Sequence, residues 1–110
     1  MRATWPALAW LIFLGAALLE VGGDATIRHG LRSSRGLPLA AGCAMLAAYG
    51  VLVNVIRWDF SRLLGVYVAV FAVVSVLFGR FVFQESVPLS TWLGLGIICL
   101  GGVVVQFGSR

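Results

Sequence analysis

Residues 5–30 read WPALAWLIFLGAALLEVGGDATIRHG, an apolar stretch that is long enough to cross a bilayer as one helix of about 20 residues. It carries an ionisable side chain, Glu20, in its interior. An ionised side chain at that depth costs about 2.5–3.5 kcal/mol on insertion scales, so such residues usually face a cavity and mark an ion or substrate path. Asp24 follows four residues later on the same helix face. The stretch therefore predicts a chain organised around a membrane-embedded acidic position.

The composition of the 110-residue chain is that of a membrane protein. Hydrophobic residues make up 61% and charged residues 11%, whereas soluble chains carry about 25% charged residues. The mean hydropathy is +1.04. All eight basic residues are arginines, and they lie between the apolar stretches, which predicts contact with lipid headgroups and argues against nucleic-acid binding. Cys43 and Cys99 have no metal-ligand spacing and are predicted to be small buried residues, so we expect no metal and no cofactor.

Four apolar stretches predict an all-α integral membrane fold. Every connection between them is short, so consecutive helices are expected to be antiparallel neighbours. The first stretch begins like a secretory signal peptide, but it runs past signal length and carries two carboxyls, so we expect it to be retained. The chain is predicted to be a single domain, residues 1–110, with four transmembrane helices at about residues 6–27, 37–56, 63–83 and 89–107.

The arginines are balanced between the two sides of this predicted topology. Four lie on the side of the chain ends and the second loop, and four lie in the first and third loops. Because positive charge normally sets orientation, equal numbers leave none preferred and predict insertion both ways with head-to-tail pairing of two copies. The two groups are Arg2, Arg57, Arg62 and Arg110, and Arg28, Arg32, Arg35 and Arg80.

Glu20 is the strongest candidate for chemistry. Burial and a second copy of the same carboxyl both favour its protonated form. Such a group holds a proton or neutralises a cation, but not both at once, which is a sufficient basis for proton/cation exchange. The alternative is a protonated Glu20 satisfied by a hydrogen bond between helices. Asp24 either completes a doubly acidic substrate site or pairs with Arg28 near the membrane edge.

Two tyrosines and a set of glycines are further candidates. Tyr49 and Tyr67 lie in adjacent predicted helices, where they either line a cation-attracting cavity or simply pack. Gly94 and Gly101 share a face of the fourth helix, with Gly102 beside them, and indicate tight helix packing between subunits or within one subunit. No nucleophile–base set, phosphate-binding loop or metalloprotease motif occurs in the sequence, so an enzyme is not expected.

These features together resemble the small multidrug resistance (SMR) transporters of the drug/metabolite transporter superfamily. The first helix looks like that family's segment with an embedded glutamate, a glycine and a basic residue, matched here by Glu20, Gly23 and Arg28. The fourth stretch, LGLGIICLGGVVV, is similar to the family's dimerisation helix, with Gly94 and Gly101 at the matching glycines.

The resemblance implies a role for each tyrosine and a dimeric assembly. Tyr67 falls where the family has a substrate-facing tryptophan, and Tyr49 falls near another aromatic position. The family works as an antiparallel homodimer in the bacterial inner membrane, with the two glutamates forming one site shared by protons and cations. Leu64 stands in place of a typical tyrosine and Asp24 in place of a small residue, which indicates a divergent member.

The sequence thus predicts a proton-coupled exporter of small or hydrophobic cations, such as guanidinium, quaternary ammonium or polyamine compounds, which works by alternating access. Its expected partners are the lipid bilayer, a second copy of itself, protons and the cationic substrate. Two alternatives stay open. One is a subunit of a lipid-linked-sugar flippase paired with a similar small protein, in which Arg28 or Arg80 would be the critical contact. The other is a non-transporting membrane assembly subunit, in which Glu20 serves helix packing.

Overall fold

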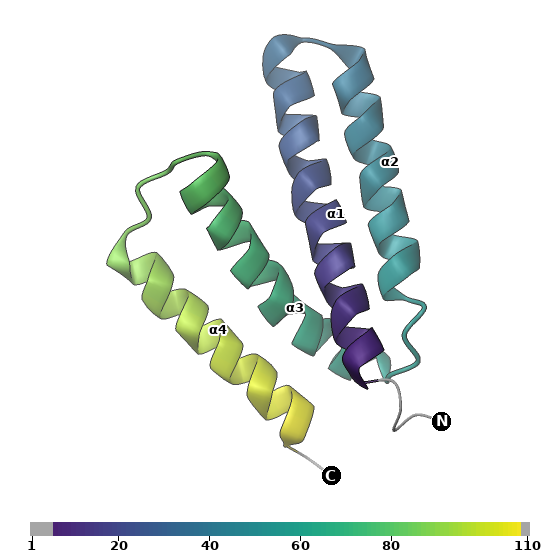
Figure 1. Ribbon diagram of the computed structural model, residues 1–110, viewed down its shortest axis with the longest axis vertical. Helices are drawn as coiled ribbons and strands as arrows, with labels where there is room; N and C mark the ends of the chain where they lie inside the picture. Colours follow the sequence, from purple (N-terminus) through teal and green to yellow (C-terminus); the bar gives the residue numbers. More distant parts are fainter. Residues whose placement is uncertain (1–5, 109–110) are drawn as a thin grey trace. The chain divides into compact units, whose positions relative to one another are not determined.

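The computed structural model describes residues 6–108 and confirms an all-helical fold, with no strand among these residues (Figure 1). Four helices are long and apolar enough to cross a membrane. Arg2 and Arg110, which entered the charge balance above, lie outside the described residues. The elements are α1 (Pro6–Ser33), α2 (Gly36–Val53), α3 (Phe60–Leu77), the short π-helical segment η2 (Phe78–Val82) that continues α3, and α4 (Leu89–Phe107).

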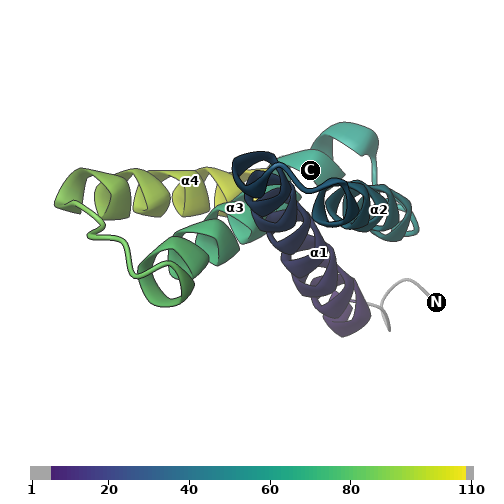
Figure 2. The same cartoon turned by 90° about the horizontal axis from the view of Figure 1, so that it is seen from above.

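The helices form two compact units. The first hairpin contains α1 and α2, and the second contains α3, η2 and α4. In the second hairpin, the non-helical residues 83–88 connect η2 to α4, and both views show this connection as an irregular loop (Figure 1, Figure 2). Each hairpin places two spans side by side in opposite directions, as the short connections predict (Figure 1).

Helix α1 continues to Ser33, beyond its predicted end at residue 27. It stops where Ser34 adopts a left-handed backbone with φ 56°, and the Arg35 amide donates a hydrogen bond of 3.0 Å to the Gly30 carbonyl. This is a Schellman-type helix end, which satisfies carbonyls left over at the C-terminus. Gly30 lies beyond the predicted end of this helix but inside the observed one, where a Cβ atom would come within 2.7 Å of the Leu39 amide nitrogen.

Helix α4 has the predicted bounds and α1 the predicted start, whereas two further helix ends differ from the predicted ones. Helix α2 ends at Val53, where the prediction ended it at residue 56, and the Asn54 amide side chain then donates to the Gly50 carbonyl at 2.8 Å. Helix α3 begins at Phe60, three residues before its predicted start, and Asp59 takes its N-cap position. The hydropathy of these flanking residues is compatible with either side of the boundary, so the pattern alone did not locate them.

Replacing Ser34 with glycine is expected to stabilise the protein by about 0.5–1 kcal/mol, because glycine adopts positive φ without the cost that a Cβ atom imposes. The matched control is Ser33→Gly, which places glycine in the last helical turn and removes the bond from the Ser33 hydroxyl to the His29 carbonyl. That control is expected to destabilise. Thermal unfolding in detergent, followed by circular dichroism, measures both, and a lower midpoint for Ser34→Gly would contradict this account of the helix end.

Many large apolar side chains are exposed among the described residues. The buried residues are few and include Phe13, Ala16 and Ala17 of α1 and Leu63 of α3. Helix α4 is the most exposed, with Leu, Ile, Val and Phe side chains along much of its length. For an integral membrane protein, such a surface faces lipid tails or another membrane helix. The structure corrects the prediction of two buried cysteines, since Cys43 is exposed on α2 and Cys99 is only half-buried on α4.

Candidate functional site

The first hairpin is built on a direct backbone contact between its helices. A Cβ atom on Gly42 of α2 would lie 2.7 Å from the Gly23 carbonyl oxygen and 2.9 Å from the Ile27 amide nitrogen of α1. A Cβ atom on Gly23 would in turn lie 3.1 Å from the Gly42 carbonyl oxygen. Two glycines facing each other therefore let the backbones of α1 and α2 approach closely, as small residues do between helices in lipid.

This contact fixes which side chains face each other along the hairpin. Glu20 lies one turn before Gly23, on the same side of α1. Tyr49 lies two turns after Gly42, on the same side of α2. Because the helices run in opposite directions, these two steps lead the same way along the hairpin and bring Tyr49 toward Glu20. Nearly one turn after Gly42, Met45 contacts α1, with its Sδ atom 3.9 Å from the Thr26 hydroxyl oxygen.

Glu20, Asp24 and Tyr49 form a cluster, which we call the acidic–tyrosine cluster. Both carboxylates act electrostatically on the Tyr49 hydroxyl. Glu20 and Tyr49 are half-buried, whereas Asp24 is exposed. Glu20 lies near the middle of the 28-residue helix α1, far from either end of the span. The cluster thus combines two carboxylates with an aromatic ring and a hydroxyl, which are the groups that bind organic cations in proteins.

The remaining candidate residues all belong to the second hairpin. Tyr67 of α3 is buried, with 3% of its surface exposed, and its ring lies 6.4 Å from the ring of Phe71 between centroids. Tyr67 is therefore in a different unit from the acidic–tyrosine cluster. On α4, Gly102 is buried, and a Cβ atom there would lie 2.8 Å from the Ala69 Cβ, so this glycine packs against α3 within the same chain. Added Cβ atoms at Gly94 and Gly101 would meet open space.

Sequence reasoning missed two polar features of the second hairpin. Arg62 lies over the Trp58 ring at 4.3 Å. It also donates a hydrogen bond of 3.2 Å to Gln106, which connects the start of α3 to the end of α4. A pocket also opens beside Glu85, at the end of η2. The spacing of Ser75 and Gly79 by one helical turn was the available signal for it. Within residues 6–108, no group of three or more His, Cys, Asp or Glu side chains is arranged to hold a metal ion.

The fold and the acidic–tyrosine cluster define a multi-pass membrane protein with an acidic position inside its first span. The chain belongs to the YnfA/UPF0060 family, since the family model described as "Uncharacterised BCR, YnfA/UPF0060 family" matches residues 7–110.

Similar bacterial proteins span almost the same length. The UPF0060 membrane protein YfjF of Bacillus subtilis is 33% identical over 91% of this chain and 94% of its own length. A UPF0060 membrane protein of Nocardia farcinica is 37% identical over 91% of this chain and 93% of its own length. A third, from Mycolicibacterium vanbaalenii, is 38% identical over 91% and 94% respectively. No solved structure matches this chain.

The prediction of membership in the SMR family is wrong, because a distinct family model covers the chain from residue 7 to its end. The features behind that resemblance were an embedded glutamate followed by a glycine and an arginine, and glycines on one face of the fourth helix. Small residues that allow close helix packing, and ionisable residues that mark a polar path, occur in membrane proteins of many families. They therefore do not separate one family from another.

Proposed function

We propose that this protein is a proton-coupled exporter of small organic cations, such as guanidinium, quaternary ammonium or polyamine compounds. The observation that carries the proposal is the position of Glu20, half-buried near the middle of a membrane-spanning helix. Asp24 lies one turn further along the same helix, and both carboxylates act on the hydroxyl of Tyr49. Carboxylates inside a span are costly and are typical of proton relays and of cation pathways.

The chemistry of the cluster suits exchange of a proton for a cation. An ionised Glu20 attracts a cation, and a protonated Glu20 does not. The Tyr49 ring offers a face to an organic cation, and its hydroxyl offers a hydrogen bond. Asp24, the more exposed carboxylate, is suited to guide a cation from the membrane edge toward Glu20. Binding of proton and cation in turn at one group couples their opposite movements.

We further propose that two copies pair head to tail in the bacterial inner membrane and work by alternating access. Gly94 and Gly101 of α4 have no neighbour within the chain that an added Cβ would meet, so both leave room for a helix of the second copy. Gly102 packs against Ala69 of its own chain. The predicted role of Tyr67, which is buried on α3 in the other hairpin, stays a prediction.

Transport in liposomes tests this proposal. The purified protein is reconstituted, a pH gradient is imposed, and currents and proton flux are recorded for methylguanidinium, tetramethylammonium and spermidine. We expect at least one cation to move against the proton flow and to saturate with concentration. Liposomes without protein supply the background. The absence of coupled flux with every cation of the panel, from protein that is folded by circular dichroism, would overturn the exporter and favour a flippase or assembly subunit.

A further inference from the structure

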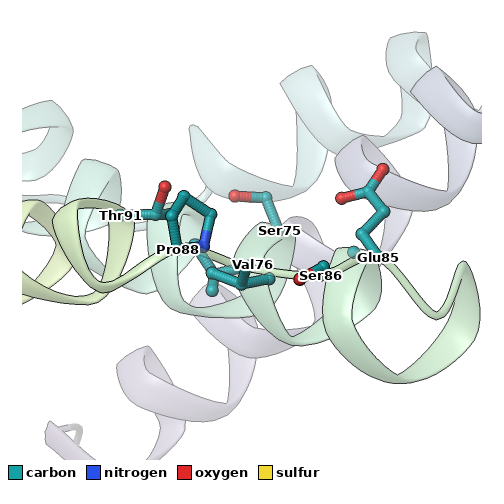
Figure 3. Close-up of a pocket in the computed structure, with 8 residues that line it drawn as sticks. Ser75, Val76, Glu85, Ser86, Pro88 and Thr91 are labelled. Carbon is teal, nitrogen blue, oxygen red and sulfur yellow. The ribbon is translucent and has the colours of Figure 1, made fainter.

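A second polar site lies in the second hairpin, in a pocket of about 210 Å³ between the end of α3, η2 and the start of α4 (Figure 3). We call it the carboxylate pocket. In the view of Figure 3, the Glu85 carboxylate and the hydroxyls of Ser75 and Thr91 lie on the same side of the connecting loop. The residues that matter for its chemistry are Ser75, Gly79, Glu85, Ser86 and Thr91.

The π-helical segment η2 places Glu85 in this pocket. The Phe83 amide donates to the Phe78 carbonyl at 3.0 Å, which makes the last turn wider than an α-helical turn. Gln84 then adopts a left-handed backbone with φ 55°, and the Glu85 amide donates to the Gly79 carbonyl at 2.8 Å. The chain therefore folds back over the end of its own helix, with Glu85 held above Gly79. Single π-helical turns of this kind are frequent at functional sites.

Gly79 supplies the space that the carboxylate occupies. It is buried, and a Cβ atom there would lie 2.6 Å from the Glu85 Oε1 atom. Any other residue at this position would push the carboxylate away. The absence of a side chain at Gly79 thus leaves room for the carboxylate of the exposed Glu85.

The polar groups of the carboxylate pocket are suited to accept hydrogen bonds from a cation. Glu85 offers a carboxylate, and Ser75, Ser86 and Thr91 offer hydroxyl oxygens. The Ser75 hydroxyl donates its proton to the Ala72 carbonyl at 3.0 Å, so its oxygen is left as an acceptor. Arg80, the nearest arginine in sequence, places its guanidinium over the Phe81 ring at 5.2 Å. The lining side chains therefore present one negative charge and several acceptors, and none of them is basic.

We propose that the carboxylate pocket binds a small primary ammonium or guanidinium group at the membrane edge. Glu85 follows the membrane span that ends at Val82, so the pocket lies at headgroup depth. The ammonium group comes either from a free organic cation or from the headgroup of an ethanolamine lipid, since the two share the same chemistry. The carboxylate pocket belongs to the second hairpin, whereas Glu20 belongs to the first. The proposal concerns binding at this pocket, so it holds whether or not the protein transports cations.

Protection of a cysteine measures this binding. Ser86→Cys is introduced into a Cys43→Ala, Cys99→Ala background, and its alkylation by a water-soluble maleimide is timed in nanodiscs. In phosphatidylcholine nanodiscs, added ethylammonium is expected to slow alkylation in a saturable way, while sodium chloride at equal ionic strength is not. In phosphatidylethanolamine nanodiscs without added cation, slow alkylation would identify the lipid headgroup as the occupant. Isothermal titration calorimetry with ethylammonium, on the protein that keeps Ser86, checks the result without the reporter cysteine.

Glu85→Gln is expected to raise the ethylammonium concentration for half-protection about tenfold, because it removes the charge from a charge-assisted hydrogen bond. Gly79→Ala, which displaces the carboxylate and keeps its charge, is expected to weaken protection as well. The matched control is Asp59→Asn, which removes an exposed carboxylate outside the pocket and keeps an N-cap residue. Equal protection in Glu85→Gln and the parent protein, or no protection in either lipid, would overturn the proposal.

Discussion

Replacing Gly42 with valine is expected to destabilise the first hairpin by about 2–3 kcal/mol, at the upper end of what overpacking costs. The first added carbon would lie 2.7 Å from the Gly23 carbonyl oxygen, and 2.9 Å from the Ile27 amide nitrogen. Both of these are backbone atoms of α1, so neither can rotate out of the way as a side chain would. The helices must separate, and the acidic–tyrosine cluster that spans them is expected to be disrupted.

Gly50→Val is the matched control for this prediction. Gly50 lies on the same helix, and a Cβ atom there would meet nothing within 4 Å. The two substitutions share the same change in helix propensity and hydrophobicity, so their difference isolates the contact with α1. Unfolding in mixed micelles with increasing sodium dodecyl sulfate, followed by tryptophan fluorescence, measures both. If Gly42→Val and Gly50→Val unfold at the same detergent fraction, the close approach of α1 and α2 does not hold the hairpin together.

Glu20→Gln is expected to abolish proton-coupled cation flux. The amide keeps the shape of the side chain, but it carries no negative charge and cannot take up or release a proton in the physiological range. Losing a hydrogen bond to a charged group costs about 1.5–3 kcal/mol, which is about 10–150-fold in cation affinity. Coupling to the pH gradient is expected to be lost entirely, so that any residual flux becomes independent of pH.

Two further variants make the Glu20 result specific. Glu20→Asp keeps the carboxyl but withdraws it by one methylene from Tyr49, so it should retain coupling with weaker cation binding. Asp59→Asn removes a carboxylate from the exposed start of α3 and should leave flux unchanged. Proton flux and cation current are recorded from the same liposomes at several pH values. Undiminished, pH-dependent flux in Glu20→Gln would exclude this carboxyl as the shared site, even if the protein proves to be a transporter.

The fold could be predicted from the sequence because hydropathy over about 20 residues is a strong and local signal. The bounds of α4 could be predicted as well. The end of α1 could not, because it depends on the conformation of individual backbone residues. Ser34 and Gln84 adopt positive φ, and neither is the glycine that normally marks such a position. Ser34 directly follows the last residue of α1, and Gln84 comes two residues after the end of η2.

The candidate site was partly predictable for a similar reason. The spacing of Glu20 and Asp24 places them on one helix face, and that is a property of any α-helix. The position of Tyr49 beside them depends on which faces of α1 and α2 meet, which the contact between Gly23 and Gly42 decides. The sequence grouped Gly102 with Gly94 and Gly101, whereas the first packs on Ala69 and the others face open space. Adjacent small residues of one helix point in different directions, and only tertiary structure separates their roles.

The division into two hairpins has a consequence for how the protein is made. Each pair of helices is closed by its own contact, through Gly23 and Gly42 in the first and through Gly102 and Ala69 in the second. A nascent chain can therefore complete its first pair of spans before the second pair has left the ribosome. Glu20 and Tyr49 belong to the same pair, so both are placed within the first hairpin before the second pair of spans is complete.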